Sequence, residues 1–231
     1  MAEFLLVHGS GFGAWCWPRV TEALAAHGHR ATAIDLPRGA GITLGDQARA
    51  ICDALAGPAI LVGHSAGGIP ITAAAERCPQ KIRALTWLCA YIPEDGSSVA
   101  SLRRRQQEQP LRPALRIDRA AGSYAFAPES LNALFFHDCP TEAQALAARL
   151  MAPESIAPQE TPLRLTARSQ TLPRYAITCE EDRAIPPAFQ HEMARALPAG
   201  NRFSLGCGHA PFFAQPARTA ALLDRIACAI L

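Results

Sequence analysis

The sequence predicts an α/β fold in which a mostly parallel sheet of about six strands is flanked by helices on both faces. Two observations carry this prediction. Short apolar runs alternate with helix-length segments along most of the chain, and glycine or proline separates many of them. In addition, the 231 residues suit a single domain that carries one insertion.

The elements follow one another in the order expected of such a sheet. Gly28 closes the first helix, Pro37 cuts off the second strand, Pro58 follows the second helix and Pro79 stops the third. The expected strands cover residues 4–7, 30–35, 59–62, 83–90, 173–179 and 202–205. The expected helices cover residues 14–27, 46–56, 66–78, 187–197 and 216–230.

One segment breaks the alternation. Between Pro93 and Pro162 no strand-like run occurs, and the segment holds an arginine run at 103–105 and an Ala-rich helical piece at 141–151. We interpret the arginine run as a solvated helix face. The sequence predicts a small helical cap over residues 97–162, inserted into a core made of residues 1–96 and 163–231. Since ligands bind at the carboxyl ends of the strands in open α/β sheets, the cap should shape the pocket.

Composition excludes several classes of protein. Hydrophobic residues make up 49% and charged residues 18% of the chain, which is typical of a globular protein and not of a disordered one. The net charge of +2 gives no electrostatic case for a nucleic-acid partner. No uninterrupted apolar stretch approaches the ~18 residues of a membrane span. We expect a monomer or a homodimer with no membrane contact.

The eight cysteines argue against a metal ribbon or a thioredoxin-like site, because no two of them form a CxxC pair. Four lie in apolar segments, where free cysteine behaves as a small hydrophobe; they are Cys52, Cys89, Cys179 and Cys228. The N-terminal MAEFLLVHGS lacks the positive charge and the long apolar core of a signal peptide. Both features predict a reducing, cytoplasmic location.

The strongest chemical signal is GHSAG at residues 63–67, a GxSxG pattern directly after a predicted strand and before a predicted helix. This arrangement is typical of a nucleophile elbow. The turn is so tight that the serine takes strained backbone angles, and a Cβ at either glycine would clash. The hydroxyl is then held above the sheet at a helix N-terminus. We interpret Ser65 as a nucleophile rather than an incidental serine in a Gly-rich turn.

Acyl transfer on a serine requires two backbone N–H donors for the developing oxyanion. We expect one from Ala66, which follows the nucleophile, and the other from Ser10, in the Gly-rich loop after the first strand. That loop, HGSGFGAW at residues 8–15, almost spells a dinucleotide fingerprint. It fails because bulky Trp15 lies where helix and strand would have to pack closely. The expected chemistry needs no cofactor and no metal.

A general base and a carboxylate complete the predicted site. His209 lies in the small-residue loop GCGHAP (206–211), directly after the last strand. The stretch CEEDR (179–183) follows the fifth strand and offers three acids, of which a short, rigid aspartate best holds an imidazole. We therefore favour Asp182 over Glu181. The resulting chain order of serine, aspartate and histidine is the one expected for this arrangement.

Four stretches together resemble a known family: VHGSGFGAWCW (7–17), LVGHSAGG (61–68), CEEDRAIPPAFQ (179–190) and GCGHAPFF (206–213). They are similar to the α/β-hydrolases of the plant methylesterase and hydroxynitrile lyase type and to their bacterial esterase relatives. The resemblance covers nearly the whole chain, and it implies an α/β-hydrolase fold. It also implies Asp182 as the acid and Ser10 and Ala66 as sources of the oxyanion amides.

The resemblance further implies the esterase branch of that family. In the lyase branch a threonine follows the first-strand histidine and a lysine follows the catalytic histidine. This chain has Gly9 and Ala210 at those positions. It departs from the plant members in a shorter, Arg-rich stretch after Pro93.

The predicted function is that of a serine esterase, which hydrolyses a small carboxylic ester through an acyl-enzyme. Phe12, Trp87, Phe136 and Phe212 are the residues expected to contact substrate, and they would suit an apolar or aromatic acyl group. Two alternatives stay open. One is a hydroxynitrile lyase or another C–C bond enzyme on the same triad. The other is a small-molecule receptor that keeps a vestigial triad and signals to a partner protein.

Overall fold

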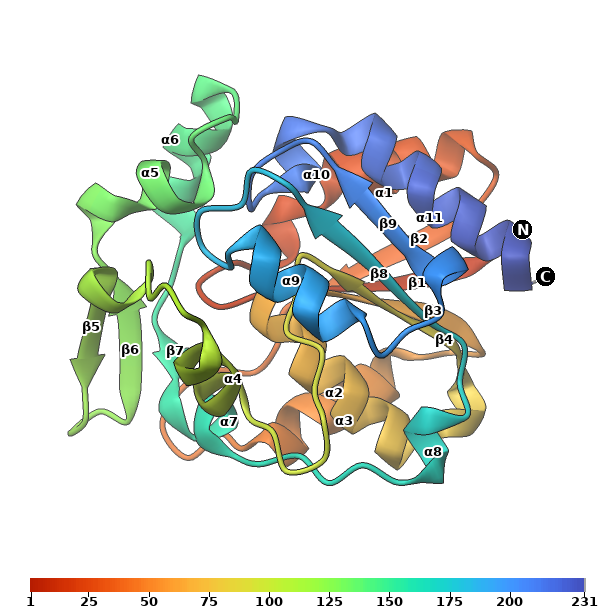
Figure 1. The fold of residues 1–231 in the computed structure, drawn as a ribbon, viewed down its shortest axis with the longest axis horizontal. Helices are drawn as coiled ribbons and strands as arrows, with labels where there is room; N and C mark the ends of the chain where they lie inside the picture. The colour runs from red at the N-terminus through yellow and green to blue at the C-terminus, as the bar shows by residue number, and fades with distance from the viewer. Residues whose placement is uncertain (231) are drawn as a thin grey trace.

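A six-stranded sheet with parallel neighbours throughout lies at the centre of the computed structural model, which describes residues 1–230 (Figure 1). Its strands are ordered β2-β1-β3-β4-β8-β9. They are β1 (Glu3–Val7), β2 (Arg30–Ile34), β3 (Ala59–His64), β4 (Ile82–Leu88), β8 (Arg174–Cys179) and β9 (Arg202–Leu205). All six expected strands are confirmed, with ends that differ by at most two residues. The α/β-hydrolase fold predicted from the sequence is therefore present.

Helices cover both faces of this sheet (Figure 1). One face carries α1 (Pro18–Ala26), α10 (Pro211–Ala214) and α11 (Pro216–Ile230), and the other carries α2 (Leu44–Ala54), α3 (Gly68–Arg77) and α9 (Pro187–Ala194). Successive strand residues alternate between the two cores: Phe4 and Leu6 pack on the first face, and Leu5 and Val7 pack on the second. Burying each such side chain contributes about 1.5–3 kcal/mol, so both faces stabilise the sheet.

Local sequence sets the helix ends and explains two shifted boundaries. Thr43 and Asp46 form a reciprocal capping box, so α2 begins at Leu44, two residues earlier than expected. The predicted helix over 14–27 divides into a 3₁₀ turn at Ala14–Cys16 and α1, which starts at Pro18. Proline lacks the N–H that would continue a helix, and it is well suited to a first helical position.

The cap between β4 and β8 contains a small sheet as well as helices, so the prediction that this segment holds no strand is wrong. Strands β5 (Leu115–Asp118), β6 (Ser123–Phe126) and β7 (Glu154–Ser155) form an antiparallel sheet. The accompanying helices are α4 (Val99–Arg105), α5 (Leu131–Phe135), α6 (Thr141–Leu150) and α7 (Ile156–Glu160), followed by α8 (Ala167–Gln170) outside the predicted cap. β5 is mostly exposed, so it shows no apolar run. Figure 1 places the cap beside the carboxyl ends of the central strands.

A disulfide joins Cys52 in α2 to Cys78 just after α3. The prediction that Cys52 is a free thiol is therefore wrong, because α2 and α3 pack side by side and bring the two Cα atoms within 6.2 Å. Among residues 1–230 the other cysteines are free, and Cys228 is exposed rather than embedded. The disulfide weakens the argument from buried thiols, and the cytoplasmic location stays a prediction.

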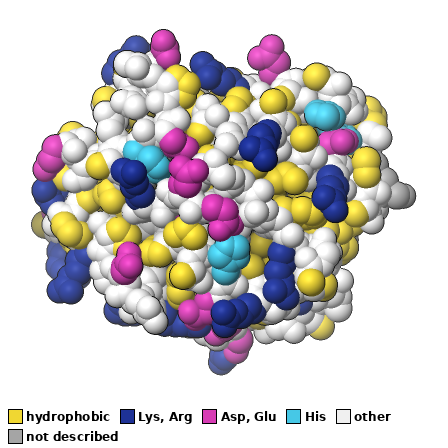
Figure 2. All heavy atoms as spheres, turned by 45° about the horizontal axis from the view of Figure 1, so that its top comes forward, with side chains coloured by type: hydrophobic (Ala, Val, Ile, Leu, Met, Phe, Trp, Pro, Cys, Tyr) yellow, Lys and Arg dark blue, Asp and Glu magenta, His cyan; other side chains and the backbone are white. Residues whose placement is uncertain are grey.

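Acidic and basic side chains are interspersed on the face drawn in Figure 2, in keeping with a net charge of +2. Such a mixture gives no broad field of one sign on that face. Within residues 1–230, none of the helices has the length and apolarity needed to cross a lipid bilayer.

Candidate active site

Three side chains from distant parts of the chain form one hydrogen-bonded line. His209 Nε2 lies 3.0 Å from Ser65 Oγ, and His209 Nδ1 lies 2.7 Å from Asp182 Oδ2. The histidine and aspartate side chains have no exposed surface. Because the carboxylate only accepts, Nδ1 carries the hydrogen and Nε2 presents its lone pair to the serine hydroxyl. This geometry suits nucleophilic catalysis by a serine with a histidine base.

The elbow after β3 holds Ser65 in a strained backbone conformation. Its φ of 54° lies in the left-handed region, which non-glycine residues seldom adopt. A Cβ at Gly63 would come within 2.6 Å of the Gly67 carbonyl oxygen, and one at Gly67 within 2.5 Å of the His8 carbonyl oxygen. Both flanking positions therefore require glycine, for the steric reason that the sequence pattern suggested.

Asp182 is held rigidly by donors other than His209. Its Oδ1 accepts the backbone N–H groups of Ala184 and Ile185 at 2.7 and 2.9 Å, and its Oδ2 accepts Gln190 Nε2 at 2.8 Å. Asp182 is buried, whereas neighbouring Glu181 is exposed. The structure thus brings Asp182, and not Glu181, to the histidine. Gln190, on α9, was not identified from the sequence.

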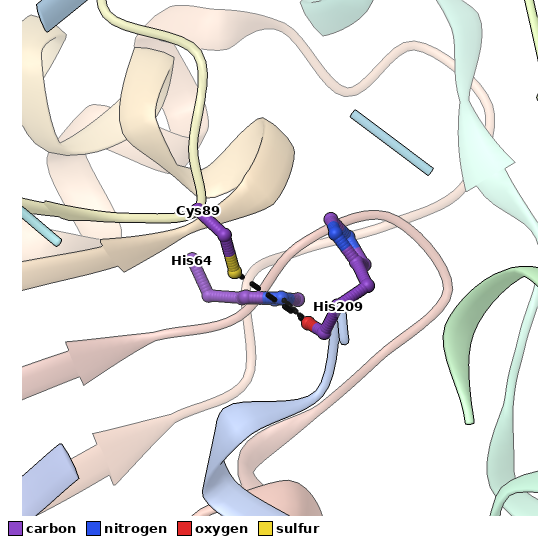
Figure 3. Close-up of side chains that lie close together, drawn as sticks. All are labelled: His64, Cys89 and His209. Carbon is purple, nitrogen blue, oxygen red and sulfur yellow. Dashed lines mark hydrogen bonds between the residues drawn. The ribbon is translucent and has the colours of Figure 1, made fainter. Parts of the chain in front are cut away.

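The backbone of His209 is fixed by two buried side chains, as Figure 3 shows. His64 Nε2 donates to the His209 carbonyl oxygen at 2.8 Å, and Cys89 Sγ lies 3.5 Å from the same atom. Burial holds the pKa of His64 well below its ordinary value, so its ring stays neutral. These contacts orient the loop that presents the His209 imidazole to Ser65.

Within the described part of the chain, His64, Cys89 and His209 also form a group whose potential ligand atoms lie within 4.8 Å of one another, close enough to hold a metal ion. Metal binding by cysteine requires the thiolate. Burial raises the pKa of the Cys89 thiol to about 12, and Nε2 of His64 carries a hydrogen that is used on a carbonyl. The cluster therefore fits a hydrogen-bonding role better than a metal site.

The Gly-rich loop after β1 lies directly against the elbow. A Cβ at Gly9 would be 2.6 Å from the Cβ of Ser65, so only glycine fits there. Ser10 and Ala66 line the same cavity as Ser65. Within residues 1–230 the backbone N–H groups of Ser10 and Ala66 make no hydrogen bond to the protein. Both amides are thus free to donate to a substrate oxygen.

The cap sheet clamps this loop through three hydrogen bonds. Tyr124 in β6 donates its hydroxyl to Ser10 Oγ at 2.7 Å, and Gly11 N–H donates to Glu154 Oε1 in β7 at 2.9 Å. The Ala152 N–H donates to the Gly11 carbonyl oxygen at 3.0 Å. Burial raises the pKa of Glu154 to about 7, although the nearby Arg38 guanidinium partly opposes the rise. None of the cap residues in this clamp was predicted from the sequence.

The cavity beside Ser65 is lined by the Gly-rich loop after β1, the elbow after β3, the segment after β4 and the cap. Its lining residues are Ser10, Ser65, Ala66, Tyr91, Val99, Arg103, Leu111, Tyr124, Phe126, Phe135 and Gln159. The four residues predicted to contact substrate do not line it. Phe12, Phe136 and Phe212 have no exposed surface, and Trp87 is 3% exposed.

These four aromatic residues are part of the protein core instead. Phe12 packs against the rings of His64, Phe136 and Phe212, with centroids 5.1–5.6 Å apart. The Trp87 indole donates to the Gly68 carbonyl oxygen. These bulky side chains pack against the core side of the loops that carry Ser10, Ser65 and His209. This packing explains why they lie next to the motifs in the sequence.

Comparison with known proteins agrees with this geometry. A family model described as the alpha/beta hydrolase family matches residues 4–222. The chain is 32% identical to methyl jasmonate esterase 1 of Vitis vinifera over 97% of this chain and 96% of that protein. It is 30% identical to methylesterase 1 of Arabidopsis thaliana, over 93% and 91% of the two chains. The crystal structure of a pyrethroid hydrolase from Sphingobium faniae JZ-2 superposes with a TM-score of 0.89 at 26% identity, over 99% and 98% of the chains.

The chain therefore belongs to the alpha/beta hydrolase family, and within it to the group that resembles the plant methylesterases. Its esterase and hydrolase relatives place it among the carboxylic ester hydrolases.

Proposed function

We propose that the protein is a serine esterase that cleaves a small carboxylic ester through an acyl-enzyme on Ser65. The observation that carries the proposal is the continuous line from Ser65 Oγ to His209 and on to Asp182, at 3.0 and 2.7 Å. Its position at the carboxyl ends of the central strands matches the ligand-binding edge of such sheets.

Acylation of the serine would proceed in two steps. Ser65 Oγ attacks the ester carbonyl carbon while His209 Nε2 takes the hydroxyl proton, and the negative charge moves to the carbonyl oxygen. The amides of Ser10 and Ala66 donate to that oxygen. The tetrahedral intermediate then collapses, and the imidazolium returns the proton to the departing alkoxide, which leaves as an alcohol.

Deacylation repeats these roles with water. His209 takes a proton from the water that attacks the acyl carbon, a second oxyanion forms on the same two amides, and Ser65 departs as the proton returns to its Oγ. The products are a carboxylic acid and the free enzyme. Asp182 stays ionised throughout, because its task is to hold the imidazole and to stabilise its charged form.

The apolar side chains that line the cavity favour one class of ester. Val99, Leu111, Phe126 and Phe135 surround the space next to Ser65, and such a lining favours an acyl group with an apolar portion beside the scissile carbonyl. The relatives include a methyl jasmonate esterase and methylesterases. A methyl ester is therefore the first alcohol portion to test.

The proposal is tested with a panel of p-nitrophenyl esters and methyl esters of aryl acids, assayed with the wild-type protein and with Ser65→Ala. We expect hydrolysis by the wild type and none above background by the variant, with the fold retained. A fluorophosphonate probe should label the wild type only. Labelling that persists in Ser65→Ala would move the nucleophile elsewhere.

The lyase alternative makes a different demand on the site. Gly9 leaves no room for the threonine that the lyase branch carries, and Ala210 is fully buried and uncharged. We therefore expect no cleavage of mandelonitrile above background. Ser65-dependent cyanide release, with aryl esters left intact, would overturn the esterase proposal and promote the lyase.

A further inference from the structure

One charged side chain reaches the catalytic cavity. Arg103, on α4, lines the cavity together with Ser65, and of the lining residues it alone carries a formal charge. It also lines the adjoining outer hollow, with Arg119 and the exposed Glu160. Arg103 therefore lies where the cavity beside the nucleophile meets the surface. The arginine run was expected to be a solvated helix face, and Arg103 departs from that expectation because it is only partly exposed.

This guanidinium has no carboxylate partner among residues 1–230. Its neighbour Arg105, by contrast, pairs with Glu94 and Glu192 on the surface. Removing a cation from water without a counter-charge costs free energy, so half-buried arginines are usually paired. Arg103 therefore supplies a positive charge at the cavity that no carboxylate of the described residues neutralises.

Two further polar groups of the cavity are available to a ligand. Tyr91 accepts Gln106 Nε2 at 3.2 Å, which leaves its own hydroxyl hydrogen free to donate, and burial raises its pKa so that it stays a phenol. Gln159 lies on α7, which packs beside α4, and its buried Oε1 has no donor among the described residues. Rotating the Gln159 side-chain amide by about 180° exchanges its oxygen and nitrogen, so that the NH₂ group can donate to a ligand.

We propose that the substrate is an ester that also carries a free, ionised carboxylate. This carboxylate binds Arg103 while the ester carbonyl lies at Ser65. Tyr91 and Gln159 would supply the remaining donors to that carboxylate. The apolar side chains between the two ends, such as Leu111 and Phe126, suit the hydrocarbon that links the two groups. This inference rests on the proposed esterase function, since it names the substrate class of the same site.

The first test compares matched esters. The monomethyl esters of succinic, glutaric and adipic acids are assayed against the same esters with the free carboxylate replaced by a carboxamide. The butyryl ester of glycolic acid is included as well, because its free carboxylate lies on the alcohol portion of the ester and not on the acyl portion. We expect at least one anionic ester to have a kcat/KM about 10- to 100-fold above its neutral counterpart, as one charged hydrogen-bonded contact predicts.

The matched variants are Arg103→Gln and Arg104→Gln, the second at an exposed position on the same helix. Arg103→Gln should remove the preference for the anionic ester, so that the ratio of its kcat/KM to that of the neutral ester falls toward 1. Arg104→Gln should keep the preference. An equal ratio of anionic to neutral turnover in the wild type and in Arg103→Gln would overturn the inference while leaving the esterase function intact.

A binding measurement separates failure of the inference from failure of the proposed function. Calorimetric titration of Ser65→Ala with monomethyl adipate should show binding that weakens with added salt and is lost in the Ser65→Ala, Arg103→Gln double variant. If the wild type hydrolyses no ester but this binding persists, the esterase proposal fails and the carboxylate site stands. Binding that is unchanged in the double variant would reject Arg103 as the carboxylate ligand.

Discussion

Asp182 accepts hydrogen bonds from two backbone amides and from Gln190 in addition to His209. Substitution by asparagine keeps the size of the side chain but lets an NH₂ group face the ring, which favours the wrong imidazole tautomer. We expect Asp182→Asn to lower kcat by about 10³–10⁴-fold, as in serine protease triads. The exposed neighbour provides the control: Glu181→Gln should change kcat by less than about tenfold in an ester assay. A reversed pair of effects would assign the acid to Glu181.

Gly9 is the point where the Gly-rich loop after β1 touches Ser65. Because an added Cβ would lie 2.6 Å from the Cβ of Ser65, Gly9→Ala must push the loop or the elbow out of position. We expect kcat for a methyl ester to fall by about 100-fold, comparable to the loss of one oxyanion donor. Gly200→Ala is the matched control, because a Cβ there meets nothing within 4 Å. If Gly9→Ala and Gly200→Ala were equally active, the contact between Gly9 and Ser65 would not be needed for activity.

At the scale of single residues, the parts of the site that were predictable lie in contiguous motifs. Ser65 and Ala66 directly follow β3, and Ser10 lies three residues after β1, so each can be recognised from a pattern of small residues after a predicted strand. His64 and Gln190 were not assigned their contacts, because these depend on loops brought together only by folding. The sequence does hold a signal for Gln190: it lies in the first turn of α9 and ends the stretch 179–190 that resembles the family.

Among the elements, β6 and β7 connect the cap to the Gly-rich loop after β1 through Tyr124 and Glu154. The Glu154 carboxyl has its pKa raised from 4.5 to about 7 in the folded protein. Between these two values the native state keeps a proton that the unfolded chain releases. The free energy of unfolding therefore falls as the pH rises through this window, by about 3 kcal/mol at most.

Glu154→Gln removes this pH dependence but retains an acceptor for Gly11. We expect the variant to gain stability relative to the wild type as the pH rises from about 5 to about 7.5, measured by urea unfolding. His8, whose pKa burial lowers to about 4, makes both proteins more stable as the pH rises toward 6.5, so the difference between them is the informative quantity. Glu160→Gln, at an exposed position, should show the same dependence of unfolding free energy on pH as the wild type. If the curve of Glu154→Gln also ran parallel to that of the wild type, Glu154 would not be the source of the pH dependence.

The central elements were predictable because each buried strand is a short apolar run between chain-breaking residues. The cap strands were not, since β5 is nearly all exposed and β7 consists of two residues. Their pairing depends on a turn at Gly122, whose φ is 60°, and on contacts with the core. The same limit explains why the four aromatic residues predicted to contact substrate do not line the cavity. An aromatic side chain near a motif can pack against the core side of the loop, and the sequence pattern does not distinguish that side from the cavity side.

For the molecule as a whole, the Cys52–Cys78 disulfide closes a loop with a sequence separation of 26 residues. Such a cross-link restricts the unfolded chain, and the loss of a native disulfide typically costs about 2–5 kcal/mol. We expect Cys52→Ala to lower the free energy of unfolding by an amount in this range under non-reducing conditions. Cys228→Ala, at an exposed free cysteine, should change it by less than about 0.5 kcal/mol. Indistinguishable stabilities would mean that the bridge does not form in solution.

The disulfide loop also encloses the nucleophile, since Ser65 lies between the two bridged cysteines. Trypsin, which cuts after arginine and lysine, would release the nucleophile in the fragment spanning residues 50–77, while Cys78 would leave in the short fragment 78–81. In an unreduced digest the two fragments stay covalently joined. A serine-directed label would therefore appear by mass spectrometry on a branched peptide, which reduction splits into a labelled long arm and an unlabelled tetrapeptide. One digest, read before and after reduction, reports both the labelled serine and the bridge around it.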